Sequence, residues 1–187
     1  PHRPRPRRGR GDRARGVERR AGLRNFAKRV AKWFSSAAHS PAGRGEPPTY
    51  PPVLDPAKVG SYPASTKSGG GYVWDEVLEY RVWSHPERGA PDECGGSDYF
   101  HAFDNYPDAL AFSHSEEGTE DPLVLILQRE HINEPKPGVF EHVKEERITE
   151  WKVEWLHRSR RTEKTIPDFL SPNAPPNRLE ILRGEID

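Results

Sequence analysis

In two segments of the chain, apolar or aromatic side chains occupy every second position, which is the pattern of β-strands. In 73–83 the apolar side chains Leu78, Tyr80 and Val82 occupy every second position, so one face of a strand is buried and the other carries the residues between them. A loop rich in Pro and Gly follows, and 98–103 is a second, aromatic segment with the same period. The pattern therefore predicts two strands, which we expect to pair.

Further elements follow at regular intervals. The pattern predicts a short helix at 106–113, a buried central strand at 123–127, an edge strand at 139–143, a strand at 148–156 and a helical turn after a Thr165-x-x-Asp168 capping box. Asp104 or Asn105 can cap the first helix. In 148–156 the apolar side chains Trp151, Val153 and Trp155 share a face.

These elements predict an α+β fold. We expect a small single domain with a four- or five-stranded, mostly antiparallel sheet and one or two short helices. Composition places its bounds at 72–170, because 46–71 is a Pro/Gly/Ser-rich linker and 171–187 is a Pro-rich tail. Three apolar residues of that tail can pack back on the domain: Leu179, Ile181 and Leu182.

Charge divides the chain into two unlike parts, although the whole chain has a formal net charge of +0. Residues 1–45 hold 14 basic and two acidic side chains, whereas 46–187 hold 15 basic and 27 acidic ones. The composition of 1–45 predicts a disordered basic arm, with a short amphipathic helix at 23–34. Such an arm can bind nucleic acid or anionic lipid, serve as a transit peptide, or be an upstream extension of the reading frame.

Several classes of protein are excluded or disfavoured by the sequence. No run of about 18 apolar residues occurs, so we expect no transmembrane segment. The single cysteine, Cys94, excludes an internal disulfide framework and favours a reducing, cytoplasmic location. The chain has no P-loop, no G-x-G-x-x-G and no H-E-x-x-H motif. Its histidines lack ligand spacing, so the sequence predicts no metal site.

The candidate site residues lie at strand ends, where rigid elements can present them. His85, beside Glu87, is a candidate general base or anion ligand, with Arg81 and Arg88 as ligand-binding residues. If the first two strands pair, a catalytic Tyr99 and a ligand-binding His101 can share a cleft with Arg81 and His85; Asp98 begins the second strand. A charged turn and ordinary core aromatics are the alternative interpretation.

Glu150 is the third candidate. It precedes Trp151 in a predicted strand, and a carboxylate beside a buried ring can act as an acid or base. The alternative is the solvated face of an edge strand.

The chain resembles a small bacterial family of uncharacterised domains that are often labelled GNAT-type acetyltransferases. The resemblance covers about residues 50–184 and depends on five segments: Y-V-W-D-E-V-L-E-Y-R-V-W-S-H-P-E-R-G (72–89), G-S-D-Y-F-H-A-F (96–103), Y-P-D-A-L-A-F-S (106–113), L-I-L-Q-R-E (125–130) and E-R-I-T-E-W-K-V-E-W-L (146–156). It implies acetyl-CoA as cofactor and acyl transfer to an amine, on a small molecule or a protein.

The order of the elements also resembles that of small ADP-ribosyltransferase-like domains, which use NAD. That resemblance implies roles for Arg81 or His85 on the first strand, Tyr99 with the 106–113 helix, and Glu150 near a later strand. A third hypothesis is non-enzymatic: an acidic interaction domain whose aromatic strands bind a protein partner.

Overall fold

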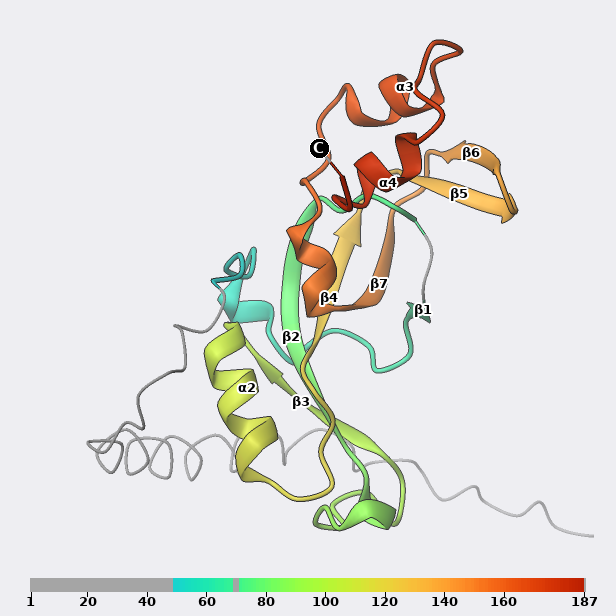
Figure 1. The fold of residues 1–187 in the computed structure, drawn as a ribbon. Coiled ribbons are helices and arrows are strands. Elements are labelled where there is room, and N and C mark those ends of the chain that lie inside the picture. Colours follow the sequence, from blue (N-terminus) through green and yellow to red (C-terminus); the bar gives the residue numbers. More distant parts are fainter. Residues whose placement is uncertain (1–48, 69–70, 187) are drawn as a thin grey trace, which may run out of the picture. The chain divides into compact units, whose positions relative to one another are not determined.

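The computed structural model describes residues 49–68 and 71–186 (Figure 1). The predictions for the basic arm 1–45 lie outside the described residues. Within the described ranges, none of the helices has the length and apolar character that crossing a membrane requires.

A five-stranded sheet forms the centre of the domain. Its strand order is β1-β7-β4-β2-β3, and the bounds are Lys67–Ser68 for β1, Glu76–Ser84 for β2, Tyr99–Phe103 for β3, Leu123–Gln128 for β4 and Arg147–Lys152 for β7. All neighbours are antiparallel except β1 and β7. The predicted α+β fold with a mostly antiparallel sheet is confirmed, and the most apolar segment of the chain, β4, is its middle strand.

The helix α2 (Tyr106–Ser115) covers one face of β2 and β3. The side chain of Asn105 caps it by accepting from the backbone N–H of Asp108 at 2.9 Å, and Pro107 lies in its first turn. Phe112 packs against Phe103 and His101, with ring centroids 5.4 Å and 4.4 Å apart. This helix and its cap follow the sequence prediction because capping and helical spacing are local signals.

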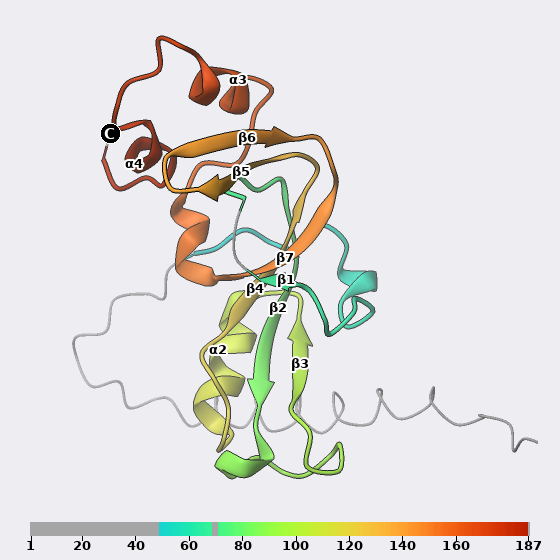
Figure 2. The same cartoon turned by 90° about the vertical axis from the view of Figure 1, so that its right-hand side faces the viewer.

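The segment 49–66 packs on the sheet, although 46–71 was predicted to be a linker. Val53 is buried, and the backbone N–H of Leu54 donates to the carbonyl of Val77 at 2.7 Å. A 3₁₀ turn, Pro56–Lys58, follows Asp55, whose side chain caps it. The start of this segment contacts α2, since the Tyr50 and Tyr106 rings have centroids 4.7 Å apart, whereas its later part lies on the other side of β2, at the right in Figure 2. The prolines of the segment therefore shape a fixed covering rather than a spacer.

Beyond the end of β4, at the top of Figure 1, a second group of elements consists of the hairpin of β5 (His131–Lys136) and β6 (Val139–Val143) with α3 (Thr165–Leu170) and α4 (Arg178–Leu182). Its core contains Val73, Ile132, Ile166 and Phe169. The sequence predicted β6 but not β5. The tail packs back as expected through Leu179 and Leu182, whereas Ile181 stays exposed.

Two predicted details are wrong. The strand predicted at 148–156 ends at Lys152, and Val153–His157 forms a 3₁₀ turn, η3. Trp151 and Val153 are both buried, so the alternation continues even though the backbone leaves the sheet. The capping box does not form either, because Thr165 is already helical and its hydroxyl accepts from the N–H of Thr162 at 2.9 Å.

Candidate functional site

One face of β2 carries a buried cluster of charges. Glu79, Arg81 and Trp83 alternate along β2, and Glu150 reaches the same face from β7, since both Glu79 and Glu150 pair with Leu125 of β4. The Arg81 guanidinium lies 2.6 Å from Glu79 through Nε and 3.5 Å from Glu150 through Nη1. The fold therefore places a cation between two carboxylates.

Two aromatic rings line the open side of this cluster. The Trp83 indole N–H lies 3.2 Å from Oε1 and 3.3 Å from Oε2 of Glu150. The Phe100 ring lies 4.2 Å from the Arg81 guanidinium and 5.3 Å from the Trp83 ring. Trp83 and Phe100 are half-buried, and the Glu150 side chain keeps 16% of its surface exposed. Glu150 is thus the charged group of the cluster that a ligand can reach.

The segment 49–66 covers the rest of the cluster. The backbone N–H of Gly60 donates to Oε2 of Glu79 at 2.6 Å, and Nη2 of Arg81 donates to the carbonyl of Pro63 at 2.9 Å. The side chains of Glu79 and Arg81 are both 0% exposed. Arg81 therefore holds Glu150 in place and is not itself open to a ligand, which differs from the ligand-binding role predicted for it.

The expected cleft shared by Arg81, Tyr99 and His101 does not form. Val82 pairs with His101 and Ser84 with Tyr99, and directly paired residues of antiparallel strands lie on the same face. Tyr99 and His101 therefore face α2, on the side opposite Arg81. Burial lowers the pKa of His101 and raises that of Tyr99, whose hydroxyl donates to the carbonyl of Pro91.

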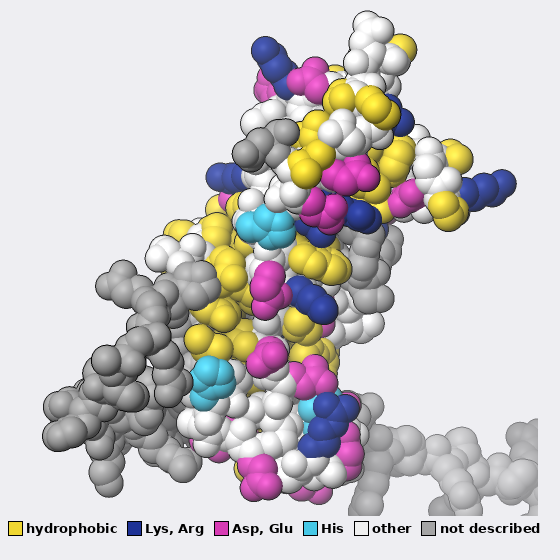
Figure 3. Space-filling model, viewed as in Figure 1, with side chains coloured by type: hydrophobic (Ala, Val, Ile, Leu, Met, Phe, Trp, Pro, Cys, Tyr) yellow, Lys and Arg dark blue, Asp and Glu magenta, His cyan; other side chains and the backbone are white. Residues whose placement is uncertain are grey.

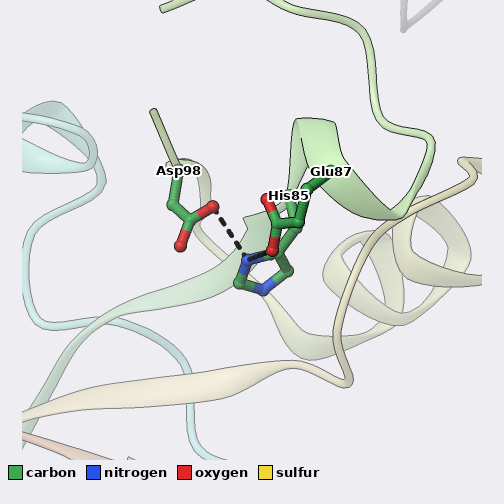
Figure 4. Close-up of side chains that lie close together, drawn as sticks. All are labelled: His85, Glu87 and Asp98. Atoms are coloured by element: carbon green, nitrogen blue, oxygen red, sulfur yellow. Dashed lines mark ion pairs between the residues drawn. The ribbon is translucent and has the colours of Figure 1, made fainter. Parts of the chain in front are cut away.

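His85 lies at a second cluster, beyond the end of β2. Its Nδ1 is 3.0 Å from Asp98 Oδ1 and 3.7 Å from Glu87 Oε1, and its Nε2 is 2.9 Å from Glu120 Oε1. Figure 4 shows the imidazole turned toward Asp98 and Glu87. In Figure 3, acidic, basic and histidine side chains gather over the loops at the lower end of the domain. Arg88, predicted as a ligand-binding residue, lies 3.1 Å from Glu120.

The sequence did not indicate two of the acidic partners. Glu79 follows the strand alternation as an outward residue and is covered only because 49–66 folds over it. Glu120 lies 35 positions after His85, and reaches it because its own N–H donates to the carbonyl of Trp83 at 2.9 Å. No spacing rule connects either residue to its partner.

No family model, curated protein or solved structure matches the chain. The resemblance to GNAT-type acetyltransferases and the arrangement resembling ADP-ribosyltransferases therefore both stay predictions, and the geometry of the two clusters is the basis for a choice.

Proposed function

We propose that the domain binds NAD and transfers ADP-ribose, with Glu150 as the catalytic carboxylate. The observation that carries the proposal is the 3.5 Å contact between Arg81 and Glu150. The resemblance to ADP-ribosyltransferase-like domains implies Arg81 or His85, Tyr99 and Glu150, and of these Arg81 and Glu150 meet here, whereas Tyr99 lies on the opposite face of the sheet. The meeting of Arg81 and Glu150 on one face supports the proposal, because nothing in the sequence alone required it.

Glu150 has the chemistry that such a transfer needs. Breaking the bond between the ribose C1′ and the nicotinamide nitrogen sends the bonding electrons to nicotinamide and leaves positive charge on the ribose. A fixed carboxylate stabilises an oxocarbenium-like centre of this kind. The acceptor then forms its bond to C1′ and releases a proton to solvent.

The rings beside Glu150 suit a planar substrate. Trp83 and Phe100 are neighbours on adjacent strands and are half-buried. Aromatic faces of this kind can stack against a nicotinamide or adenine ring. Trp83 also directs its indole N–H at Glu150, so the ring that would bind the substrate is held in register with the carboxylate.

Arg81 acts in this proposal as a positioning residue. It is fully buried and paired with Glu79, so it fixes the carboxylate of Glu150 without touching NAD. The backbone of Gly60 and Pro63 covers the Glu79–Arg81 pair and hydrogen-bonds to both side chains. The segment 49–66 therefore helps to hold the site in place.

Acetyl transfer has less support from the fold. Acetyl-CoA enzymes of the GNAT type bind the pyrophosphate at a helix that follows a central strand. In this domain β4 ends at Gln128 and β5 begins at His131, so a two-residue turn takes the place of that helix. Acetyl-CoA stays a prediction, and the same experiment tests it.

The test is a calorimetric titration of the full chain with NAD and, separately, with acetyl-CoA, followed by an assay for nicotinamide release. We expect NAD to bind and Glu150→Gln to slow nicotinamide release about 100-fold or more, since it removes the stabilising charge. Glu141→Gln is the matched control, because Glu141 is exposed on β6.

Binding of acetyl-CoA but not of NAD would replace the proposal with acyl transfer. Absence of binding for both would favour a protein-binding domain. Equal rates for Glu150→Gln and Glu141→Gln would remove Glu150 from the chemistry even if NAD binds.

A further inference from the structure

We propose that His85, Glu87 and Asp98 bind a divalent transition-metal cation such as Zn²⁺, with Glu120 orienting the imidazole. This inference does not depend on the proposed function, because it concerns a different cluster. The three residues offer one nitrogen and two carboxylate oxygens that all lie within 4.8 Å of one another.

His85 is a buried imidazole whose hydrogen-bonding capacity is unused among the described residues. Its side chain is only 9% exposed, and among the described residues neither ring nitrogen makes a hydrogen bond. Carboxylate oxygens lie close to both nitrogens but off the directions that a hydrogen bond needs. Buried polar atoms are nearly always satisfied, and an exception calls for an unseen water or ion. The Nδ1 atom faces Asp98 and Glu87 (Figure 4).

The distances between the donor atoms suit a shared cation. Ligand atoms that lie about 2.1 Å from a zinc ion at angles between 90° and 109° are roughly 3.0–3.4 Å apart. Nδ1 is 3.0 Å from the Asp98 oxygen and 3.7 Å from the Glu87 oxygen. A small rotation of the exposed Glu87 side chain, which is also ion-paired with Arg88 at 3.6 Å, brings the second distance into this range.

The opposite side of the ring faces a carboxylate of the kind that metal-bound histidines usually have as their second partner. A ligating imidazole commonly directs its other N–H at a carboxylate, which fixes the tautomer. Here Glu120 lies 2.9 Å from Nε2, off the direction of a hydrogen bond, and is paired with Arg88 at 3.1 Å; a small turn of its side chain, which is 40% exposed, lets it accept from the Nε2–H. Nδ1 is therefore the nitrogen left for the cation.

The backbone around the cluster is fixed before any ion binds. The N–H of His85 donates to the carbonyl of Gly118, and its carbonyl accepts from Arg88 and Ala90. Gly118 has φ +72, and a Cβ there would lie 2.3 Å from the backbone nitrogen of Ala90. The loops after β2 and after α2 are thus joined closely, which holds His85 and Glu120 in register.

Charge and ligand type select the class of cation. Three carboxylates surround the ring, and in the part of the chain that the structure describes Arg88 is the one arginine paired to them. An imidazole ligand favours Zn²⁺ and similar transition metals, whereas Mg²⁺ and Ca²⁺ prefer oxygen ligands alone. We therefore expect Zn²⁺ to bind and Mg²⁺ not to compete with it.

The test is a calorimetric titration of the metal-free full chain with Zn²⁺, repeated in excess Mg²⁺. Asp98→Asn and Glu87→Gln change exposed side chains and should leave the fold intact, and each should raise the Kd at least about tenfold. Glu93→Gln removes one acid from the same loop outside the cluster, so its Kd should stay within about twofold of the unaltered chain. Absence of Zn²⁺ binding, equal values for Asp98→Asn and Glu93→Gln, or displacement by Mg²⁺ would overturn the proposal.

Nitrogen NMR of the imidazole separates a metal ligand from a plain ion pair. With Zn²⁺ present we expect His85 to show a metal-bound Nδ1 and a protonated Nε2, with its signal assigned by loss in His85→Gln. Two protonated nitrogens in the presence of Zn²⁺ would identify an imidazolium paired with Asp98 and Glu120, and the cation site would be rejected.

Discussion

The two faces of β2 are equally buried but are stabilised in different ways. Tyr80 and Val82 on one face and Glu79 and Arg81 on the other are all 0% exposed. The first face packs rings against α2, with Tyr80 and Tyr106 centroids 6.1 Å apart. The second pairs charges beneath the segment 49–66. Burial alone therefore does not tell which kind of chemistry a face supports.

The difference lies in how strictly each face needs its partners. Apolar contacts lose stability gradually when a neighbour shifts, whereas a buried charge without its counter-charge loses several kcal/mol, about 3–5. The charged face thus forces a fixed geometry on Glu150, its one open carboxylate. A rigid and partly open carboxylate suits the transfer that we propose, and this is why the proposal uses that face.

Removing the cation from the charged face should cause the largest loss of stability. Arg81→Met leaves Glu79 buried and unpaired, and we expect it to lower the free energy of unfolding by about 3–5 kcal/mol. Urea denaturation of the full chain measures this loss.

A double variant sharpens the test. Adding Glu79→Gln to Arg81→Met removes the uncompensated charge, while the amide oxygen can still accept from the N–H of Gly60. We expect it to recover about 1–3 kcal/mol. A double variant no more stable than Arg81→Met alone would mean that the cation–π packing on Phe100, and not the charge, was lost.

The sequence predicted the strands and the helix of this region better than it predicted which residues share a face of the sheet. The alternation in β2 and β3, the apolar run of β4 and the cap at Asn105 are local patterns, and each formed. The register between β2 and β3 is not local: Arg81 pairs with Ala102, which places Tyr99 and His101 on the other face. The single expected cleft was wrong for that reason.

Other errors have the same physical origin. β5 contains a proline and four polar residues, so it lacks any alternation and is a strand only through its pairing with β6. The alternation of Trp151, Val153 and Trp155 was real, but a 3₁₀ turn can bury Val153 as well as a strand can. The sequence placed Glu87 beside His85, but the partners Asp98 and Glu120 come from separate segments, so their contact with His85 could not be read from it.

Removing the cap of α2 tests the aromatic face, the side of β2 that packs against α2, and should cost less stability. Asn105→Ala removes the acceptor for the N–H of Asp108, and loss of such a cap costs about 1 kcal/mol. We expect urea denaturation to show this loss, and we expect the nicotinamide release proposed for this domain to be unchanged in the same variant. A parallel loss of activity would mean that the two faces are coupled and not independent.

The smallest expected effect is a pH dependence that belongs to the aromatic face alone. Burial lowers the pKa of His101, so below about pH 6.5 the unfolded chain binds a proton there more readily than the folded chain does. Stability should therefore fall as the pH decreases through 6.5 toward the folded pKa, by less than the roughly 1.4 kcal/mol per pH unit that one full proton gives. His101→Phe keeps a ring against Phe112 and should remove the part of the pH dependence of stability that His101 contributes. The control is His114→Gln, which changes an exposed histidine of α2 and should leave that pH dependence unchanged. Stability is measured by urea denaturation between pH 5 and 7. An equal dependence of stability on pH in the two variants would show that the acid sensitivity of the domain comes from the charged clusters and not from the aromatic face.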